Sequence, residues 1–322
     1  MAVYNRGKLL IYSGMEFLGE SAALTTALCW AFTSLFFSEA GKLIGSFNVN
    51  KIRLVFAVTI YLIVLSISKG HILPDTLTTE HVIWLGISGV IGLVIGDGAG
   101  FKAMVMIGPR LTMLLHSTAP VMATILAWIF LGETLNIKDI IGISATVAGI
   151  SWVVSERKYR NHPNKLRDGH PDAGSLLKGV LLGLTAAFGQ ASGLVLAKHA
   201  MLDLTTTVEP MEASFVRMFV SMIVIWTISF FRGKTAETLR SFKDKKAILY
   251  SLSGALTGPF LGVWMSLVAV KYIAAGIAAT LNATTPIWLL PLTRITHKEK
   301  ISVRILFGTI IAVGGVALLL LQ

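Results

Sequence analysis

The sequence predicts an all-α membrane protein of about ten transmembrane helices, arranged as two inverted five-helix repeats. Hydrophobic residues make up 54% of the 322 residues and charged residues only 14%, and the mean hydropathy is +0.73. Soluble domains carry about a quarter charged residues. The apolar runs are continuous rather than alternating, which favours helices over a membrane β-barrel. An internal repeat indicates two related units.

The apolar runs are long enough to cross a hydrocarbon core about 30 Å thick, which takes roughly 20 helical residues. In chain order, the predicted spans lie near residues 20–40, 52–68, 82–105, 110–131, 138–155, 177–199, 211–231, 247–271, 274–293 and 302–321. Five of these spans fall in each half of the chain.

The internal repeat has a constant offset of 166 residues and needs no gap. The matched pairs include Gly92 with Gly258, Gly96 with Gly262, Leu115 with Leu281, Pro120 with Pro286, Glu133 with Glu299 and Gly149 with Gly315. Because each half has an odd number of crossings, the second unit must enter the membrane in the opposite orientation. Inverted repeats around a central site are a recurring design of secondary transporters.

The domain boundaries follow from the repeat and from local composition. Residues 1–14 are predicted to form an N-terminal tail, and residues 15–155 the first five-helix repeat. Residues 156–176 are basic and polar and contain prolines, which is typical of a linker. The second five-helix repeat is predicted to occupy residues 177–322.

The net charge of +11 raises the possibility of nucleic-acid binding, but it is better explained by membrane topology. Most Lys and Arg residues lie in the connections after the first, third, fifth, seventh and ninth predicted helices. By the positive-inside rule these connections are cytoplasmic, so both termini lie outside the cell membrane. We therefore expect the lipid bilayer as a partner and no nucleic acid.

Several ordered patterns make the chain similar to EamA-type members of the drug/metabolite transporter superfamily. They are the small-residue and Trp segment of Ala27–Phe32, the arginines Arg53 and Arg217, the prolines Pro120 and Pro286, and the glutamates Glu133 and Glu299. The resemblance implies a ten-helix, two-repeat fold with a central cavity that carries a small metabolite, often outward. It also implies cytoplasmic termini, in disagreement with the charge distribution.

Asp97 is the strongest candidate for a functional residue because it lies deep in the third predicted helix. A carboxylate at the centre of a membrane helix costs about 2.5–3.5 kcal/mol on insertion scales. One interpretation is a protonatable group that faces the cavity and couples proton movement to transport. The other is a structural partner for Lys102 or Arg110. The repeat counterpart of Asp97 is Val263, so only one half carries the charge.

Other candidates for the substrate or proton pathway are polar or aromatic. His116 in the fourth helix has Asn282 as its counterpart, and both either face a shared cavity or bond a neighbouring helix. Trp30 and Trp264 are candidate cavity aromatics. Pro120 and Pro286 are expected to kink their helices.

The remaining signals are structural. Helix packing is the predicted role of the glycines Gly92, Gly96, Gly100, Gly254, Gly258 and Gly262. Glu133 and Glu299 are expected to cap or pair near helix ends, and the candidate partners of Arg217 are Glu212 and Glu209. The sequence lacks a phosphate-binding loop and metal-ligand spacing, so it predicts no cofactor, no metal and no catalytic residues.

Together these features predict a secondary transporter of small metabolites that works by alternating access. An exporter of amino acids or related polar or amphipathic compounds is the leading form, with Asp97 as a candidate for proton coupling. A passive channel and a non-transporting membrane scaffold are the alternatives, and a membrane-embedded enzyme is less favoured. Because each half already has its inverted partner, the chain can function as a monomer.

Overall fold

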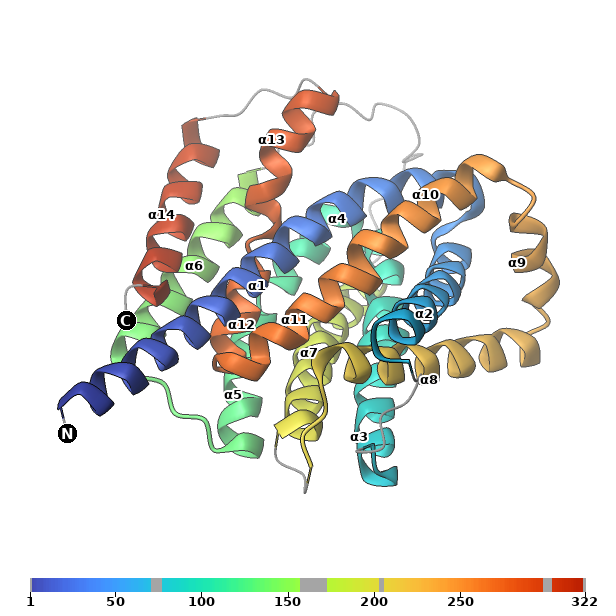
Figure 1. Ribbon diagram of the computed structural model, residues 1–322. Helices are drawn as coiled ribbons and strands as arrows, with labels where there is room; N and C mark the ends of the chain where they lie inside the picture. Colours follow the sequence, from blue (N-terminus) through green and yellow to red (C-terminus); the bar gives the residue numbers. More distant parts are fainter. Residues whose placement is uncertain (1, 71–76, 157–172, 203–205, 298–302, 321–322) are drawn as a thin grey trace.

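A computed structural model describes residues 2–70, 77–156, 173–202, 206–297 and 303–320, and these residues form helices and short connections without any strand (Figure 1). In chain order the first half holds α1 (Ala2–Ile44), α2 (Ser46–Lys69), α3 (Thr79–Gly89), η1 (Val90–Gly96), α4 (Asp97–His116), α5 (Ala119–Leu131) and α6 (Ile137–Glu156). The second half holds α7 (Ala173–Leu202), α8 (Pro210–Phe231), α9 (Thr235–Ser241), α10 (Lys245–Ala255), η2 (Leu256–Gly262), α11 (Val263–Tyr272), α12 (Ala275–Asn282), α13 (Thr285–His297) and α14 (Val303–Leu320). The predicted all-helical class is confirmed.

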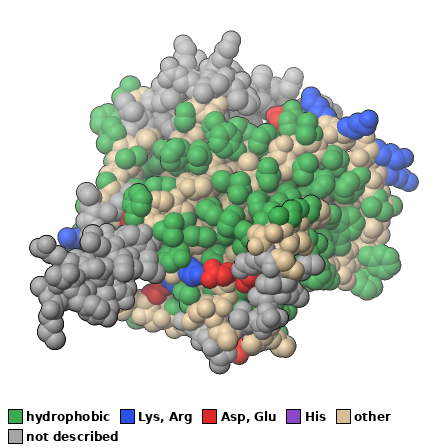
Figure 2. All heavy atoms as spheres, viewed as in Figure 1, with side chains coloured by type: hydrophobic (Ala, Val, Ile, Leu, Met, Phe, Trp, Pro, Cys, Tyr) green, Lys and Arg blue, Asp and Glu red, His purple; other side chains and the backbone are tan. Residues whose placement is uncertain are grey.

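The surface of the molecule suits a lipid environment. Six helical segments within the described residues are long and apolar enough to cross a membrane, and two shorter apolar helices, Ala119–Leu131 and Phe307–Leu319, accompany them. Figure 2 shows a broad hydrophobic surface across the middle of one face, with Lys and Arg at its upper right margin. Exposing large apolar side chains such as Ile67, Phe231 and Leu249 to water would cost free energy, whereas contact with lipid tails does not.

The predicted N-terminal tail is helical, and most of the predicted linker lies outside the described residues. Helix α1 already begins at Ala2, so residues 2–14, which the sequence assigns to a tail, continue into the first span as one helix. Residues 157–172 of the predicted linker lie outside the described part of the chain, and so does Glu299.

The chain reverses direction within α4, although every residue from Asp97 to His116 is helical. A straight helix would separate Gly100 from His116 by about 24 Å. Instead, a methyl group added at Gly100 would lie 3.5 Å from His116 Nε2 and 3.3 Å from Ala186. The chain must therefore reverse between these two residues, in agreement with the predicted boundary between a third span that ends near 105 and a fourth that begins near 110.

Each repeat contains a seven-residue π-helical segment, and the two segments are related by the same offset as the sequence repeat. They are η1 in the first half and η2 in the second. A π-helical segment widens the helix by one residue per turn and is frequent at functional sites. Both segments hold two of the predicted packing glycines, and Asp97 follows η1 directly.

Both fourth helices of the repeats are interrupted shortly before their prolines. The breaks fall at Ser117–Thr118, before Pro120, and at Ala283–Thr284, before Pro286. At each break the threonine hydroxyl donates a 2.6 Å hydrogen bond to a backbone carbonyl three residues earlier, from Thr118 to Leu115 and from Thr284 to Leu281. The hydroxyls thus satisfy carbonyls at the same place in both halves.

The last helices of the two repeats, α6 and α14, pack against each other in a reciprocal way. A methyl group at Gly142 would lie 3.1 Å from the Gly315 carbonyl, and one at Gly149 would lie 2.7 Å from the Gly308 carbonyl. Gly315 is the repeat counterpart of Gly149, and Gly308 that of Gly142. Such an exchange of partners is the mark of a two-fold axis. The antiparallel direction of the contact agrees with inverted repeats.

The middle glycines bring helices of the two halves close together. A methyl group at Gly189 of α7 would lie 2.8 Å from the Cα atom of Gly96 in η1. A methyl group at Gly258 of η2 would lie 2.6 Å from Thr33 Cγ2 in α1. Each π-helical segment therefore lies against the first helix of the other repeat, and we call the first of these contacts the η1–α7 seam.

Candidate functional site

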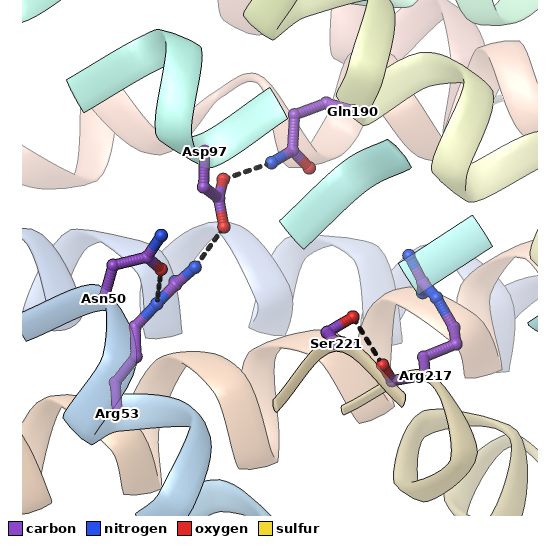
Figure 3. Close-up of polar contacts among 6 residues, drawn as sticks. All are labelled: Asn50, Arg53, Asp97, Gln190, Arg217 and Ser221. Carbon is purple, nitrogen blue, oxygen red and sulfur yellow. Dashed lines mark hydrogen bonds and ion pairs between the residues drawn. The ribbon is translucent and has the colours of Figure 1, made fainter. Parts of the chain in front are cut away.

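A charged network lies at the η1–α7 seam and connects three helices (Figure 3). Arg53 of α2 forms an ion pair with Asp97 through Nη2 and the carboxylate Oδ2. Gln190 of α7 donates a 2.6 Å hydrogen bond from Nε2 to the other carboxylate oxygen, Oδ1. Arg53 Nε donates a 2.7 Å hydrogen bond to Asn50 Oδ1, one turn earlier on α2. Both oxygens of the carboxylate are therefore occupied.

The network is buried. The Arg53 side chain is 1% exposed and that of Asp97 is 13% exposed. The rings of Phe37 and Phe101 lie 5.8 and 5.9 Å from the Arg53 guanidinium carbon, at cation–π distance. In such surroundings a charge is retained only when it is paired and hydrogen-bonded, and Asp97 and Arg53 satisfy each other.

The geometry follows from the local sequence. Because Gly96 and Gly189 lack side chains, η1 and α7 approach closely, and the next residue on each, Asp97 and Gln190, can meet across the contact. Of the structural partners expected for Asp97, Lys102 has an exposed side chain. The ion-pair partner in the structure is Arg53, which the sequence indicated only as part of the family resemblance and not as a partner of Asp97.

Arg217 of α8 is the second buried arginine, and its surroundings differ. It is 5% exposed, and its Nε has no hydrogen-bond partner. The expected pairing with Glu209 is wrong, because that glutamate binds Lys271 at 2.9 Å. The Ser221 hydroxyl donates to the backbone carbonyl of Arg217 and not to its side chain (Figure 3). Among the described residues, no acidic side chain forms an ion pair with Arg217.

The predicted pathway residues are only partly brought together. His116 lies next to Gly100, one turn after Asp97, and is within electrostatic range of that carboxylate. Trp30 lies on the other contact, where its Nε1 would be 3.4 Å from a methyl group at Gly262. Trp264 packs against Phe260, and Asn282 has a buried Oδ1 without a hydrogen-bond partner. Among the described residues, neither Trp264 nor Asn282 forms a hydrogen bond or ring contact with Arg53, Asp97 or Gln190.

A separate polar cluster joins the two repeats near the connection between α5 and α6. Glu133 forms an ion pair with Lys198 at 2.5 Å and accepts a 2.8 Å hydrogen bond from the backbone N–H of Ala275 at the start of α12. Lys198 also donates to the Ile273 carbonyl at 2.8 Å. Glu133 therefore caps a helix and pairs with a lysine, as the sequence analysis expected for a glutamate at a helix end.

Another cluster lies at the start of α2. Lys51 is fully buried and donates to the hydroxyls of Ser229 and Thr238, and its ammonium lies 4.5 Å above the ring of Phe47. Thr238 in turn donates to Asn48 at 2.9 Å. This cluster ties the first repeat to the region around α9 in the second.

Other sites for ligands are sparse in the described part of the chain. No group of three or more His, Cys, Asp or Glu side chains is placed to hold a metal ion among the described residues. A groove of about 440 Å³ lies between α3, η1 and α8, but its lining of Val82, Ile87, Val90, Val220 and similar residues is apolar. The groove does not include the Asp97 network.

The arrangement defines a class of protein, the multi-pass membrane protein built from two inverted repeats with a polar network where the repeats meet. The family comparison narrows this class. The EamA-like transporter family matches residues 17–155 and 177–321. The chain therefore belongs to the EamA-like transporter family, and it is a membrane transporter, as the resemblance predicted.

Curated relatives and a solved structure agree with this assignment. An "Uncharacterized transporter" from Archaeoglobus fulgidus is 24% identical over 300 residues, covering 93% of this chain and 96% of the relative. Another "Uncharacterized transporter", from Clostridium kluyveri, is 23% identical over 166 residues, covering 51% of this chain and 53% of the relative. A crystal structure covers 94% of this chain and 96% of its own with a TM-score of 0.72 and 16% identity, which shows a shared fold.

Proposed function

We propose that the protein is a secondary transporter that exports small polar or amphipathic metabolites, with amino acids as the leading class, by alternating access. The observation that carries the proposal is the network of Arg53, Asp97 and Gln190, which connects the two repeats at a buried seam. Ionisable groups inside a membrane protein are costly, and they typically mark a substrate or ion pathway.

The network combines a strong interaction within one repeat with a weaker one between the repeats, and this combination suits an interface that rearranges during transport. The ion pair between Arg53 and Asp97 lies within the first repeat, whereas the hydrogen bond from Gln190 crosses to the second. When one repeat rocks against the other, the neutral donor can leave while the ion pair stays intact. Breaking the buried ion pair would cost about 3–5 kcal/mol, which is more than the roughly 1.5–3 kcal/mol of a hydrogen bond from a neutral donor to a charged acceptor.

Proton coupling through Asp97 is part of the proposal. Protonation of the carboxylate removes its attraction for Arg53 and turns one oxygen into a donor, so that both contacts of Asp97 are weakened together. A proton bound on one side of the membrane would then favour the rearrangement of the seam. His116, near Gly100, is a candidate for passing the proton to or from Asp97.

The test is counterflow in proteoliposomes with radiolabelled amino acids and other metabolites at two pH values. We expect saturable exchange in the wild type and loss of its pH dependence in Asp97→Asn. The control Glu39→Gln removes an exposed carboxylate that pairs with Lys42, and it should leave exchange unchanged. Flux without counterflow would instead indicate a channel, turnover without flux an enzyme, and no flux for any compound a scaffold.

The orientation and the working unit complete the proposal. We propose external termini in the cell membrane, because the positive connections such as the one around Lys243 belong inside. Arg53 and Lys51 are buried and so do not count as loop charges, but the remaining charges still favour this side. With Cys29 replaced by Ala, Thr134→Cys should react with an impermeant maleimide in whole cells and Lys243→Cys should not. The opposite pattern would place the termini inside.

A monomer is proposed to suffice because both inverted repeats are in one chain. The molar mass of the protein in detergent, measured by light scattering, should correspond to one copy. A dimer that loses transport on dissociation would contradict this part of the proposal.

A further inference from the structure

The buried charges around the seam do not balance. Two arginines, Arg53 and Arg217, are almost fully buried there, but within the described part of the chain only Asp97 offers a carboxylate that pairs with either of them. Asp97 is already held by Arg53 and Gln190. Tyr61 and Asp97 lie within electrostatic range of Arg217, yet neither forms a hydrogen bond or ion pair with it. Arg217 therefore has no ion-pair partner among the residues that the structure describes.

The Arg217 guanidinium packs against glycine backbone, and its neighbours do not satisfy it. A methyl group at Gly193 would lie 3.4 Å from Nη2, and one at Gly92 would lie 3.6 Å from it. Both positions are glycines, so the guanidinium lies directly against backbone that carries no side-chain acceptor. The Ser88 hydroxyl is bonded to the Gly193 carbonyl at 2.5 Å, and Ser221 is bonded to the Arg217 backbone. Both hydroxyls act as donors here, and among the described residues neither accepts a hydrogen bond from the Arg217 guanidinium.

The Tyr61 hydroxyl is also engaged. It donates to the backbone carbonyl of Phe260 at 2.8 Å, and the Pro259 carbonyl lies 3.3 Å away. Figure 3 shows Arg217 apart from the bonded group of Arg53, Asp97 and Gln190, with its guanidinium beside the neighbouring helix. No acceptor among the described residues compensates the charge.

An unpaired buried guanidinium is costly, and a purely structural role would not need it. The repeat counterpart of Asp97 is Val263, which is buried and apolar, so no second acid stands at that position. The Arg217 guanidinium lies against Gly92 and Gly193 at the η1–α7 seam, where Asp97 is already paired. An anion brought in by a ligand would supply the missing counterion.

We propose that Arg217 binds the carboxylate of the transported metabolite, which supplies the counterion that the described residues do not provide. This inference rests on the proposed transport function. The planar guanidinium forms two parallel hydrogen bonds with a carboxylate, which fits this anion better than a point charge would. The substrate class is thus narrowed to compounds that carry a free carboxylate.

The position of Asp97 favours α-amino acids within this class. Gly92, which lies beside Arg217, and Asp97 are five positions apart along the π-helical segment η1, which is about one turn. A carboxylate on Arg217 would therefore leave the ammonium group of an amino acid on the side of Asp97. The ammonium group would share the Asp97 carboxylate with Arg53 and Gln190.

The first experiment measures binding without transport. The purified protein in detergent is heated with benzoate or acetate, and separately with benzamide or acetamide, at matched ionic strength, while tryptophan fluorescence is followed. We expect the carboxylates, but not the amides, to raise the unfolding midpoint of the wild type. The shift should vanish in Arg217→Gln and persist in Arg232→Gln, which removes an exposed arginine from the end of the same helix. Equal shifts by acid and amide, or an unchanged shift in Arg217→Gln, would overturn the proposal.

The second experiment measures transport and separates the carboxylate site from the proposed transport function. In wild-type proteoliposomes that exchange L-leucine, unlabelled L-leucine should compete at least tenfold better than L-leucinamide, and Arg217→Lys should raise KM by a similar factor. Equal competition by the amide would overturn the carboxylate site while transport stands. Absence of exchange for every amino acid, together with carboxylate protection that depends on Arg217, would overturn amino-acid transport and leave the anion site in place.

Discussion

The two repeats have the same helices, the same π-helical segments and the same breaks before proline, but they treat their buried arginines differently. In the first repeat Arg53 is paired with Asp97, and in the second Arg217 has an unpaired Nε. The symmetric parts lie where backbone packs on backbone, as at Gly142 and Gly149. The asymmetric parts are single side chains. A duplicated scaffold can thus keep its packing while one charge pair is left incomplete for a ligand.

The largest effect is expected from breaking the pair in the first repeat. Arg53→Leu leaves Asp97 buried with only Gln190 as a partner, and this should lower the free energy of unfolding by about 3–5 kcal/mol. Thermal or denaturant unfolding in detergent measures the loss. The double variant with Asp97→Asn should recover part of it, because no charge is then left unpaired. A loss that is simply the sum of the two single losses would argue against a coupled pair.

The next largest effect concerns the close contact between the repeats. Gly189→Ala would place a methyl group 2.8 Å from the Cα of Gly96, and the overpacking should cost about 1–3 kcal/mol of stability. Gly98→Ala is the matched control, because nothing lies within 4 Å of its methyl group. The control should be neutral or slightly stabilising, since alanine favours a helix over glycine. Equal unfolding midpoints for the two variants would show that the seam is not tightly packed.

In the second repeat, removing the buried arginine is not expected to lower the free energy of unfolding. Arg217→Met removes a buried charge that has no partner, and the free energy of unfolding should stay level or rise by about 1 kcal/mol. Exchange activity should nevertheless be lost, since the variant keeps the fold and removes the proposed anchor. The unfolding midpoint and the counterflow rate are measured on the same preparation. A destabilisation as large as that of Arg53→Leu would give both arginines the same structural role.

The smallest effects are expected at the breaks before the prolines. Thr118→Val and Thr284→Val each remove one hydroxyl that satisfies a backbone carbonyl, and each should cost about 0.5–1.5 kcal/mol. Because the two bonds have the same length and the same place in the repeat, the two losses should be similar. Unfolding midpoints of the two variants compare them directly. A clear difference would mean that the symmetry of the backbone does not extend to its energetics.

Several membrane spans were predictable from the sequence to within a few residues, whereas the start of α1 at Ala2 and the short helix α9 were not. The predicted spans near 138–155 and 211–231 correspond to α6 (Ile137–Glu156) and α8 (Pro210–Phe231). Length and hydropathy suffice for this because every backbone group in a lipid-exposed span must be satisfied within its own helix. The repeat was predictable because glycines and prolines recur in the sequence at a constant offset of 166 residues.

The partners of the charged residues were decided by tertiary structure alone. Asp97 and Arg53 are 44 positions apart, and Asp97 and Gln190 are 93 positions apart. Which side chains meet depends on how each helix is rotated about its axis and where glycines allow close approach. An apolar run carries little information about that rotation. The sequence therefore determined two inverted helical repeats and marked Asp97 as costly, whereas packing decided that Arg53 pairs with it and that Arg217 does not.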